Sequence, residues 1–204
     1  MAKLTLTSFV TLDGVVQAPG GPNEDTSGNF QHGGWLVPLF GSDMGLIMLD
    51  IFSRASAFLM GRGTYDIFSA HWPKITDPGD PVAALLNSLP KFVASNTQSS
   101  FDWAHTSHVA DVAGEIEAIK NQFDGELQVH GSCGLAQTLI EQNLIDEYRL
   151  FIVPVALGDG KRLFNSFSSP RGLKLMGARS MANGVTYHVY RPDQNFQTGS
   201  FHLE

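Results

Sequence analysis

The chain has 204 residues, of which 43% are hydrophobic and 16% charged, and its net charge at pH 7 is -7. This composition is typical of a globular domain and excludes a disordered chain. The acidic balance provides no basic surface for phosphate backbones, so we expect no nucleic-acid partner. Its apolar runs fall short of the ~18 residues of a membrane span, so we expect no membrane partner. The single cysteine, Cys133, is typical of a reducing cytoplasm.

The first half of the chain alternates between apolar strand-like segments and helical periodicity. Period-two alternation predicts a strand over 3–10. A Gly- and Pro-rich loop over 11–34 follows, and loops of this length are usually functional. Ser42 is a suitable N-cap for the next helix. The pattern then predicts a helix over 42–55, a strand over 57–60, a helix over 64–70, a helix over 81–90 and a strand over 91–95.

The second half repeats the helix-strand order and ends differently. The pattern predicts a helix over 111–123 capped by Asp111, a strand over 126–130, a turn and helix over 131–144, a strand over 146–157 and a hairpin over 173–192. Asn183 and Gly184 can supply the positive φ angles of the hairpin turn. This order indicates an α/β fold whose mostly parallel sheet has antiparallel strands at one edge. We expect one domain over 1–192 and a polar tail over 193–204.

The segment FLMGRGTYDIFSAHWP, residues 58–73, predicts a strand that runs through a tight turn into a helix. Gly61 and Gly63 allow a ligand to approach the backbone. The helix N-terminus offers free N–H groups and the positive end of its dipole. Arg62 can add a charge-assisted bond to a phosphate. Taken alone, the segment is equally consistent with an anion site and with a plain turn that carries a solvent-facing arginine.

Two later strand ends have similar chemistry. VHGSCGLAQTL, residues 129–139, again joins a strand to a helix through a Gly-rich turn, but it lacks the three-glycine dinucleotide fingerprint. Ser132 is also a natural N-cap there. VASNT, residues 93–97, can hold a ribose or phosphate, although a plain turn explains it better when it is taken alone. Ligands collect beyond the carboxyl ends of strands in open α/β sheets, so these ends indicate one crevice.

Five segments, taken in order, resemble the dihydrofolate reductase-like superfamily. They are residues 8–19, 58–73, 89–97, 127–164 and the closing hairpin. The resemblance is strongest to the reductase domain of the deaminase/reductase of riboflavin synthesis and to related stand-alone bacterial proteins. It implies a three-layer sandwich with a central mixed eight-stranded sheet, helices on both faces and an antiparallel C-terminal hairpin. It also implies a reduced nicotinamide cofactor, NADPH with NADH possible, and a homodimer.

The resemblance assigns roles to residues of three motifs and one loop. It implies cofactor contacts from Gly61, Arg62, Gly63, Thr64, Ser95, Asn96, Thr97, Gly131, Ser132, Cys133, Gly134 and Leu135. The loop that contains Leu12, Asp13, Gly14, Val15, Gln17 and Ala18 is expected near the nicotinamide and the substrate.

Some positions depart from the family pattern. Many relatives have a second basic residue where this chain has Gly63 and an arginine where it has Asn96. Arg62 is then nearly alone in favouring NADPH over NADH. The riboflavin enzymes typically have a lysine at the position of Val15, and this chain also lacks the zinc deaminase motif. Both observations count against the riboflavin substrate.

The acid that would serve hydride transfer is not obvious in the sequence. Asp43 is the nearest counterpart of the dihydrofolate reductase acid, although Gly45 occupies the better-aligned position and a first-turn acid is favoured by the helix dipole anyway. Asp13 is the second candidate, but Asp-Gly is a common turn pair. Trp35 can stack on a planar substrate or simply pack. Cys133 is interpreted as a small filler residue, and the histidines have no metal-ligand spacing, so no metal is expected.

These observations predict a cytoplasmic NADPH-dependent reductase of a small planar heterocycle, pterin-like or aminopyrimidine-like. The alternative is a non-catalytic dimeric sensor or scaffold that binds NADP(H) or another nucleotide, which the missing clear acid favours. A phosphoester-handling enzyme is disfavoured, because the sequence has neither a metal-binding acid cluster nor a Walker-type lysine turn.

Overall fold

The computed structural model describes residues 1–165 and 170–201, and a sheet forms its centre. The strands are β1 (Lys3–Thr11), β2 (Ala55–Gly61), β3 (Lys91–Ala94), β4 (Thr106–Val109), β5 (Glu126–His130), β6 (Glu147–Val153), β7 (Gly172–Ser180) and β8 (Thr186–Asp193). In the described residues they form one eight-stranded sheet in the order β4-β3-β2-β5-β1-β6-β8-β7. The strands from β4 to β6 pair in parallel, whereas β8 and β7 are antiparallel. The predicted mixed sheet with an antiparallel hairpin is confirmed.

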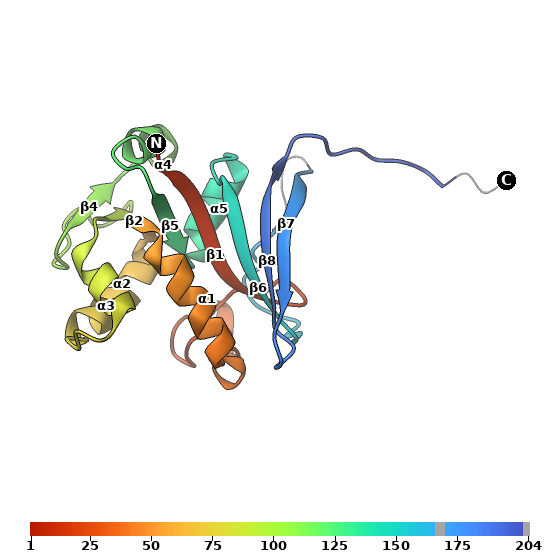
Figure 1. The fold of residues 1–204 in the computed structure, drawn as a ribbon, viewed down its shortest axis with the longest axis horizontal. Helices are drawn as coiled ribbons and strands as arrows, with labels where there is room; N and C mark the ends of the chain where they lie inside the picture. Colours follow the sequence, from red (N-terminus) through yellow and green to blue (C-terminus); the bar gives the residue numbers. More distant parts are fainter. Residues whose placement is uncertain (166–169, 202–204) are drawn as a thin grey trace.

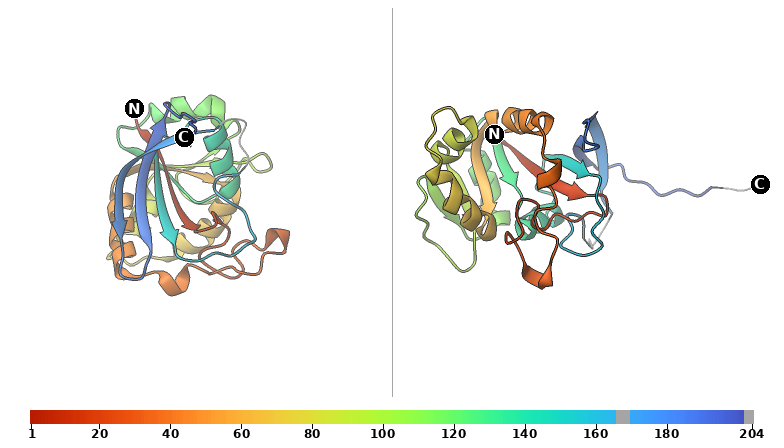
Figure 2. Two further views of the ribbon diagram at one scale, coloured as in Figure 1. Left: turned by 90° about the vertical axis from the view of Figure 1, so that its right-hand side faces the viewer. Right: turned by 90° about the horizontal axis from the view of Figure 1, so that it is seen from below.

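Helices cover both faces of the sheet (Figure 1; Figure 2). They are α1 (Ser42–Ser53), α2 (Arg62–His71), α3 (Pro81–Ser88), α4 (Val112–Lys120) and α5 (Cys133–Glu141), with short 3-10 turns at Ser27–Asn29, Val37–Leu39 and Trp72–Lys74. Apolar side chains of α4 and α5 pack in one core cluster with Leu4, Leu6 and Leu127. Those of α1, α2 and α3 belong to two further clusters on the other face. This arrangement confirms the predicted layers.

Strand alternation decides which side chains face which helices. Leu4 and Leu6 of β1 point toward α4 and α5, so the residues between them, Thr5 and Thr7, point toward α1. Parallel pairing places Gln128 beside Thr5 and His130 beside Thr7. A row of polar side chains therefore crosses the sheet under α1, where an all-apolar surface would be usual.

The strands differ most from the sequence prediction at β4 and at the end of β6. The structure contains β4, for which the residue pattern gave no strand, although the family resemblance required an eighth one. Only one of its four residues, Val109, is buried, so the usual alternation signal is weak. In addition, β6 ends at Val153 and does not continue to residue 157. Pro154 has no backbone N–H to continue the ladder.

Several predicted caps are wrong in detail. The N-cap of α1 is Gly41, and Ser42 is its first residue. Asp111 holds the N-cap position of α4 without a side-chain cap bond; the Glu115 carboxylate accepts from its backbone N–H at 2.9 Å instead. In the hairpin turn Gly184 has φ 85°, whereas Asn183 has no positive φ. Glycine alone relieves the left-handed conformation there.

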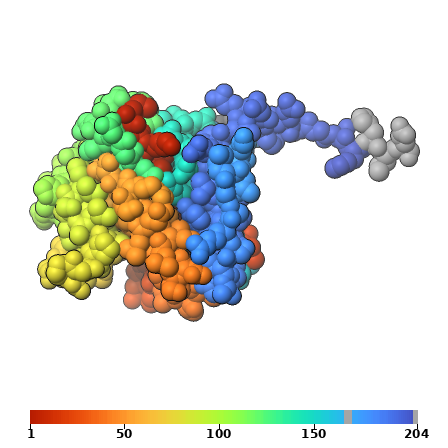
Figure 3. All heavy atoms as spheres, viewed as in Figure 1, coloured from red at the N-terminus to blue at the C-terminus, as the bar shows by residue number. Residues whose placement is uncertain are grey.

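The β7–β8 hairpin forms one flank of the molecule, and residues 194–201 extend from it without helix or strand (Figure 3). Nearly all of β7 is exposed, including Leu175 and Met176. Within the described residues, no helix combines the length and the hydropathy that crossing a membrane requires.

Candidate functional site

A cavity of about 1390 Å³ opens beyond the carboxyl ends of β2, β3 and β5, the place where open α/β sheets bind ligands. Its lining divides into two parts. The helix-terminus end consists of Gly61–Thr64 and Gly131–Leu135, at the starts of α2 and α5. The α1 end is lined by Gln17, Ala18, Glu24, Met48, Leu49, Phe52 and His130.

At the helix-terminus end, two helices begin side by side without side-chain caps. Ser132, predicted as the cap of α5, instead bonds across to the other helix. Its Oγ accepts from the Gly61 N–H at 2.8 Å and donates to Thr64 Oγ1 at 2.5 Å. A Cβ on Gly61 would lie 2.8 Å from that Oγ, so this close approach requires glycine. The first N–H groups of both helices therefore remain available to an anion.

Arg62 is the first residue of α2, not part of a preceding turn. Its Nη1 bonds Asp66 Oδ2 at 2.6 Å, one helical turn further on, and both side chains are about half exposed. Both residues line the cavity. An exposed pair of this kind contributes little to stability, so the guanidinium can exchange Asp66 for a phosphate at low cost.

The third predicted motif lies at the carboxyl end of β3. Ser95 and Asn96 line the cavity, whereas Thr97 does not. Ser95 Oγ accepts from the N–H groups of Thr97 and Gln98 at 3.2 and 3.0 Å. Ser95 therefore shapes the turn, and Asn96 has the side chain of the three best placed to meet a ligand.

The loop after β1 contributes two of its predicted residues to the cavity, Gln17 and Ala18. Gln17 is buried, and its amide donates to Asp25 O and Ser27 O at 3.0 and 2.9 Å. Its Oε1 accepts from the backbone of Lys161 at 3.0 Å. Gln17 thus fixes the loop that forms one wall of the cavity.

The other four predicted loop residues and Trp35 lie outside the lining. Val15 is fully buried in the core cluster that also contains Trp35. Trp35 Nε1 donates to Gln17 O at 2.8 Å, so its ring supports the wall from behind. Gly14 has φ 87° and packs against the Arg162 side chain. Leu12, from the same segment, is exposed.

Neither predicted acid lines the cavity. Asp43 lies in the first turn of α1, and Gly45 of the same turn lines the cavity instead. Asp13 accepts from Thr11 Oγ1 at 2.6 Å and from the N–H groups of Leu157 and Gly158 at 3.2 and 2.7 Å. These bonds, that of Thr11 above all, lower the pKa of Asp13 to about 2. Asp13 is therefore ionised at neutral pH and ties the loop after β1 to the segment after β6.

The polar side chains of the cavity that the sequence did not single out include Glu24, Asp25, Lys161 and His130. Glu24 Oε2 accepts from the N–H groups of Gly20 and Gly21 at 2.6 and 3.1 Å. Burial raises the pKa of Glu24, and the charge of Asp25 adds to that rise. Asp25 pairs with Lys161 Nζ at 2.6 Å. The fourth is His130, at the end of β5. Only the position of Glu24 and Asp25 in the long loop gave a signal, because unstructured loops of that length are usually functional.

The single cysteine, Cys133, lines the cavity and is unsuited to act as a nucleophile at neutral pH. Burial raises the pKa of the Cys133 thiol to about 11, and the thiolate is the reactive form. Among the described residues, no group of three or more His, Cys, Asp and Glu side chains could hold a metal ion.

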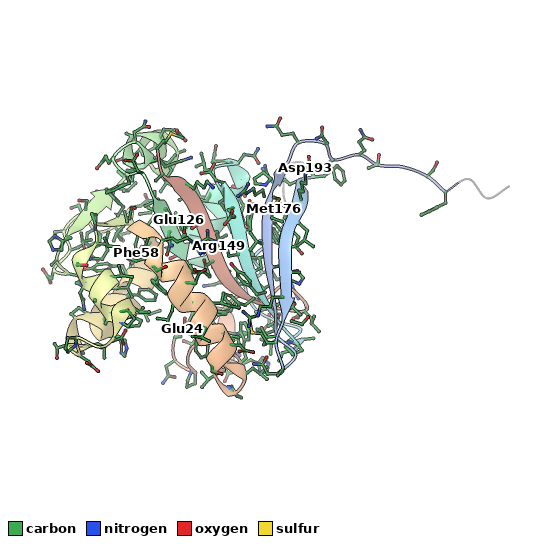
Figure 4. All side chains as sticks on the ribbon, in the orientation of Figure 1. Glu24, Phe58, Glu126, Arg149, Met176 and Asp193 are labelled. Carbon is green, nitrogen blue, oxygen red and sulfur yellow. The ribbon has the colours of Figure 1, made fainter. Side chains whose placement is uncertain are left out.

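A buried charge network supports the α1 end from below. Figure 4 shows Glu126 and Arg149 together on the sheet behind α1. Arg149 donates to both carboxylate oxygens of Glu126 at 2.7 Å and to Glu147 Oε1 at 2.7 and 2.9 Å. All three side chains are buried. Such a network is held by complete pairing, and removing one member leaves an uncompensated charge.

The model of the RibD C-terminal domain matches residues 2–187. The chain belongs to the RibD C-terminal domain family. It is also 29% identical over 190 residues to the Bacillus subtilis (strain 168) protein YyaP, described as uncharacterized, with 92% of this chain and 94% of YyaP covered. Family membership confirms the resemblance inferred from the five segments.

Solved structures agree on the fold. A Shewanella sp. PV-4 protein named for riboflavin biosynthesis has a TM-score of 0.69 at 23% identity, covering 95% of this chain and 100% of that one. A Thermotoga maritima deaminase/5-amino-6-(5-phosphoribosylamino)uracil reductase has 0.61 at 14%, with coverages of 94% and 57%. Enterococcus faecalis dihydrofolate reductase, complexed with NADP(H), has 0.59 at 12%, with coverages of 94% and 97%. The fold is dihydrofolate reductase-like.

Proposed function

We propose that this protein is an NADPH-dependent reductase that transfers a hydride to a small planar heterocycle, pterin-like or aminopyrimidine-like. The observation that carries the proposal is a single cavity that joins two uncapped helix N-termini to a mainly apolar compartment under α1. The first part suits a pyrophosphate and the second suits a flat ring. Membership of a reductase-type family and the likeness to a fold that binds NADP(H) in a neighbour support it.

The helix-terminus end fits the phosphates of the cofactor. The N–H groups of α2 and α5 converge there, and Gly61 allows close approach to the backbone. Arg62 adds the positive charge that distinguishes a 2′-phosphate from a hydroxyl. The same arrangement leaves room for NADH, because the described residues place only one arginine in the lining. The Ser95–Asn96 turn also lines the cavity and suits the adenosine half.

The α1 end fits the nicotinamide and the substrate. When bound, the reduced nicotinamide supplies the hydride. Phe52, Met48 and Leu49 of α1 exclude water from the reacting rings. Glu24, whose pKa burial raises, is the lining acid best suited to hold the proton that balances the hydride. Its Oε2 accepts from two N–H groups, and Oε1 has no partner among the described residues.

A non-catalytic NADP(H) sensor is the second candidate function. One observation favours it: both acids predicted from the sequence, Asp43 and Asp13, lie outside the cavity lining. The two candidates share the cofactor site and differ at the α1 end, where only a reductase needs a proton source. Glu24 is therefore the residue that separates them.

We also propose that the protein is cytoplasmic and forms a homodimer through the β7–β8 hairpin. Leu175 and Met176 of β7 are 50% and 47% exposed, and the adjacent tail adds Phe196 at 51%. An apolar sheet face of this kind commonly marks an interface. Light scattering should give twice the mass of the chain, and Met176→Glu should give a monomer. Leu46→Glu, on the exposed side of α1, is the matched control that stays dimeric.

The experiment that tests the function is an NADPH oxidation assay with a panel of pterins, aminopyrimidines and related imines. A reductase turns over at least one member and slows when Glu24 becomes Gln. Binding of NADPH with no turnover across the panel would favour the sensor. Absence of binding by both NADPH and NADH would exclude both candidates.

A further inference from the structure

Three side chains of β5 form a polar line that leads from the buried charge network to the cavity. Glu126, Gln128 and His130 alternate along the strand and so share the face under α1. Glu126 is bound by Arg149 through both oxygens. His130 lines the cavity at the other end of the line. The hydrogen bonds between these residues determine what His130 offers to a ligand.

The amide of Gln128 has one possible orientation. Its Nε2 lies 2.6 Å from Ile51 O and 2.7 Å from Glu126 Oε2, which both accept only. The amide nitrogen must occupy that place, because an amide oxygen there would face two acceptors. Gln128 Oε1 therefore points to His130 Nε2, 2.9 Å away. Since an amide oxygen can only accept, His130 Nε2 carries the proton.

The imidazole of His130 is neutral as well as oriented. Burial, with the charge of Arg149 adding to it and that of Glu126 opposing it, lowers the pKa of His130 to about 3. A neutral ring has one N–H, and here it is on Nε2. Nδ1 is then a lone-pair acceptor throughout the physiological pH range. The ring cannot turn over without breaking its bond to Gln128.

The position of the ring makes this acceptor available to a ligand. The His130 ring stacks on Phe52 at 4.4 Å between centroids, with an interplanar angle of 3°. No described residue bonds to Nδ1. Next to His130 across the sheet, the buried hydroxyl of Thr7 also has no partner among the described residues. The α1 side chains that line the cavity, Met48, Leu49 and Phe52, are apolar, so a ligand without a donor would leave Nδ1 unpaired at a cost.

We infer that His130 is a specificity-determining residue whose Nδ1 accepts a hydrogen bond from an N–H group of the substrate ring. The inference rests on the proposed reductase function, because only a reductase makes this ligand a substrate. It narrows the class of substrate. The ring must carry an amino or ring N–H donor at its edge, as aminopyrimidines and pterins do. A ring with only acceptors or methyl groups at that edge is selected against.

The first test uses the unmodified protein with 15N-labelled histidine. NMR should show His130 with a proton on Nε2 and none on Nδ1 from pH 5 to pH 9, unchanged by pH. Addition of NADP⁺ with 2,4-diaminopyrimidine should shift the Nδ1 resonance, and 2,4-dimethylpyrimidine should not. A protonated Nδ1 would overturn the inference. So would an Nδ1 resonance that does not shift when 2,4-diaminopyrimidine binds.

The second test compares affinities for the same two pyrimidines in three proteins. The wild type should prefer the diamino ring to the dimethyl ring by ~10- to 100-fold, and His130→Phe, which keeps a stacking ring, should lose most of that preference. His188→Phe is the matched control, since His188 lies on β8 outside the cavity lining and bonds Tyr190. An equal preference in His130→Phe and wild type would contradict the inference.

A third comparison separates the substrate from the cofactor. The 3-acetylpyridine analogue of NADP⁺ has a methyl group where the nicotinamide carboxamide has its amine. The ratio of its affinity to that of NADP⁺ should be the same in wild type and in His130→Phe. A change in that ratio would assign Nδ1 to the cofactor and overturn the substrate assignment. Failure of NADPH to bind at all would refute the proposed function, while the NMR result would still show whether Nδ1 is an acceptor.

Discussion

The two ends of the cavity are built in different ways. The helix-terminus end consists of backbone and small residues in two short segments, Gly61–Thr64 and Gly131–Leu135, joined by the bonds of Ser132. The α1 end consists of side chains from β5, α1 and a long loop, held by the buried Glu126–Arg149 pair and by Gln17. Under the proposed function, the first end binds phosphates that many ligands share, whereas the second selects one ring.

Replacing Glu24 by Gln should have the largest effect on the α1 end. Removing the proton source should lower kcat by ~10²- to 10⁴-fold with little change in NADPH affinity. The active form of the acid is protonated, so wild-type kcat should fall as the pH rises through the raised pKa of Glu24. The variant should lose that dependence.

The control for this prediction is Asp25→Asn. Asp25 also lines the cavity but is paired with Lys161, so its loss should keep the pH dependence. The dependence should move to lower pH, because the charge of Asp25 contributes to the raised pKa of Glu24. Stopped-flow NADPH oxidation across pH 5 to 9 measures both variants. An unchanged kcat and pH profile in Glu24→Gln would contradict the proposal that the α1 end supplies the proton while the helix-terminus end binds the cofactor.

The support of the α1 end should be the next most sensitive feature. Arg149→Met leaves Glu126 and Glu147 buried without their main partner, which should reduce the free energy of unfolding by about 3–5 kcal/mol. Arg191→Met is the matched control, because Arg191 also contacts Glu147 but is 47% exposed, and its loss should cost less than about 1 kcal/mol. Urea unfolding measures the free energy of unfolding of both variants. Equal losses would contradict the claim that the buried charge network supports the α1 end.

The smallest predicted effects concern the charge at the helix-terminus end. Arg62→Ala should weaken NADPH binding about tenfold and NADH binding less, because only NADPH carries the 2′-phosphate. Asp66→Asn releases the Arg62 guanidinium from its pair and should strengthen NADPH binding slightly. Calorimetric titration of both cofactors gives the comparison. Equal losses for NADPH and NADH in Arg62→Ala would place Arg62 on the pyrophosphate instead.

The same contrast explains what could be predicted from the sequence. The fold class and the helix-terminus end could be inferred, because each strand, Gly-rich turn and helix start is contiguous in the chain and uses local signals. The role of Ser132 could not, since its bond to Gly61 spans 71 residues. In the sequence, a serine before a helix indicates an N-cap. Only the structure shows that the start of a second helix lies close enough for Ser132 to bond to it.

Local sequence patterns predicted little of the α1 end. His130 has only the local signal of the last residue of a strand. Its character depends on Gln128 and Glu126 of the same strand and on Arg149, which reaches them only through sheet register. Glu24 lies in a loop without periodicity, where no local pattern distinguishes a surface acid from one that lines a cavity. Asp13 and Asp43 are the acids that the sequence favours, because both are close to recognisable motifs. Closeness in sequence does not place either side chain in the cavity.

The most direct test of the account is a titration of the purified protein with NADPH, repeated with Gly61→Val. A side chain at position 61 would press on Ser132, whose Oγ lies 2.8 Å from the position of a Cβ. Gly177→Ala, on β7 with open space around it, controls for the addition of carbon alone. The account predicts wild-type binding with a Kd of about 1 mM or below, a matching value for Gly177→Ala, and a loss of about 100-fold or more in Gly61→Val. Absence of wild-type binding, or equal binding by Gly61→Val, would contradict it.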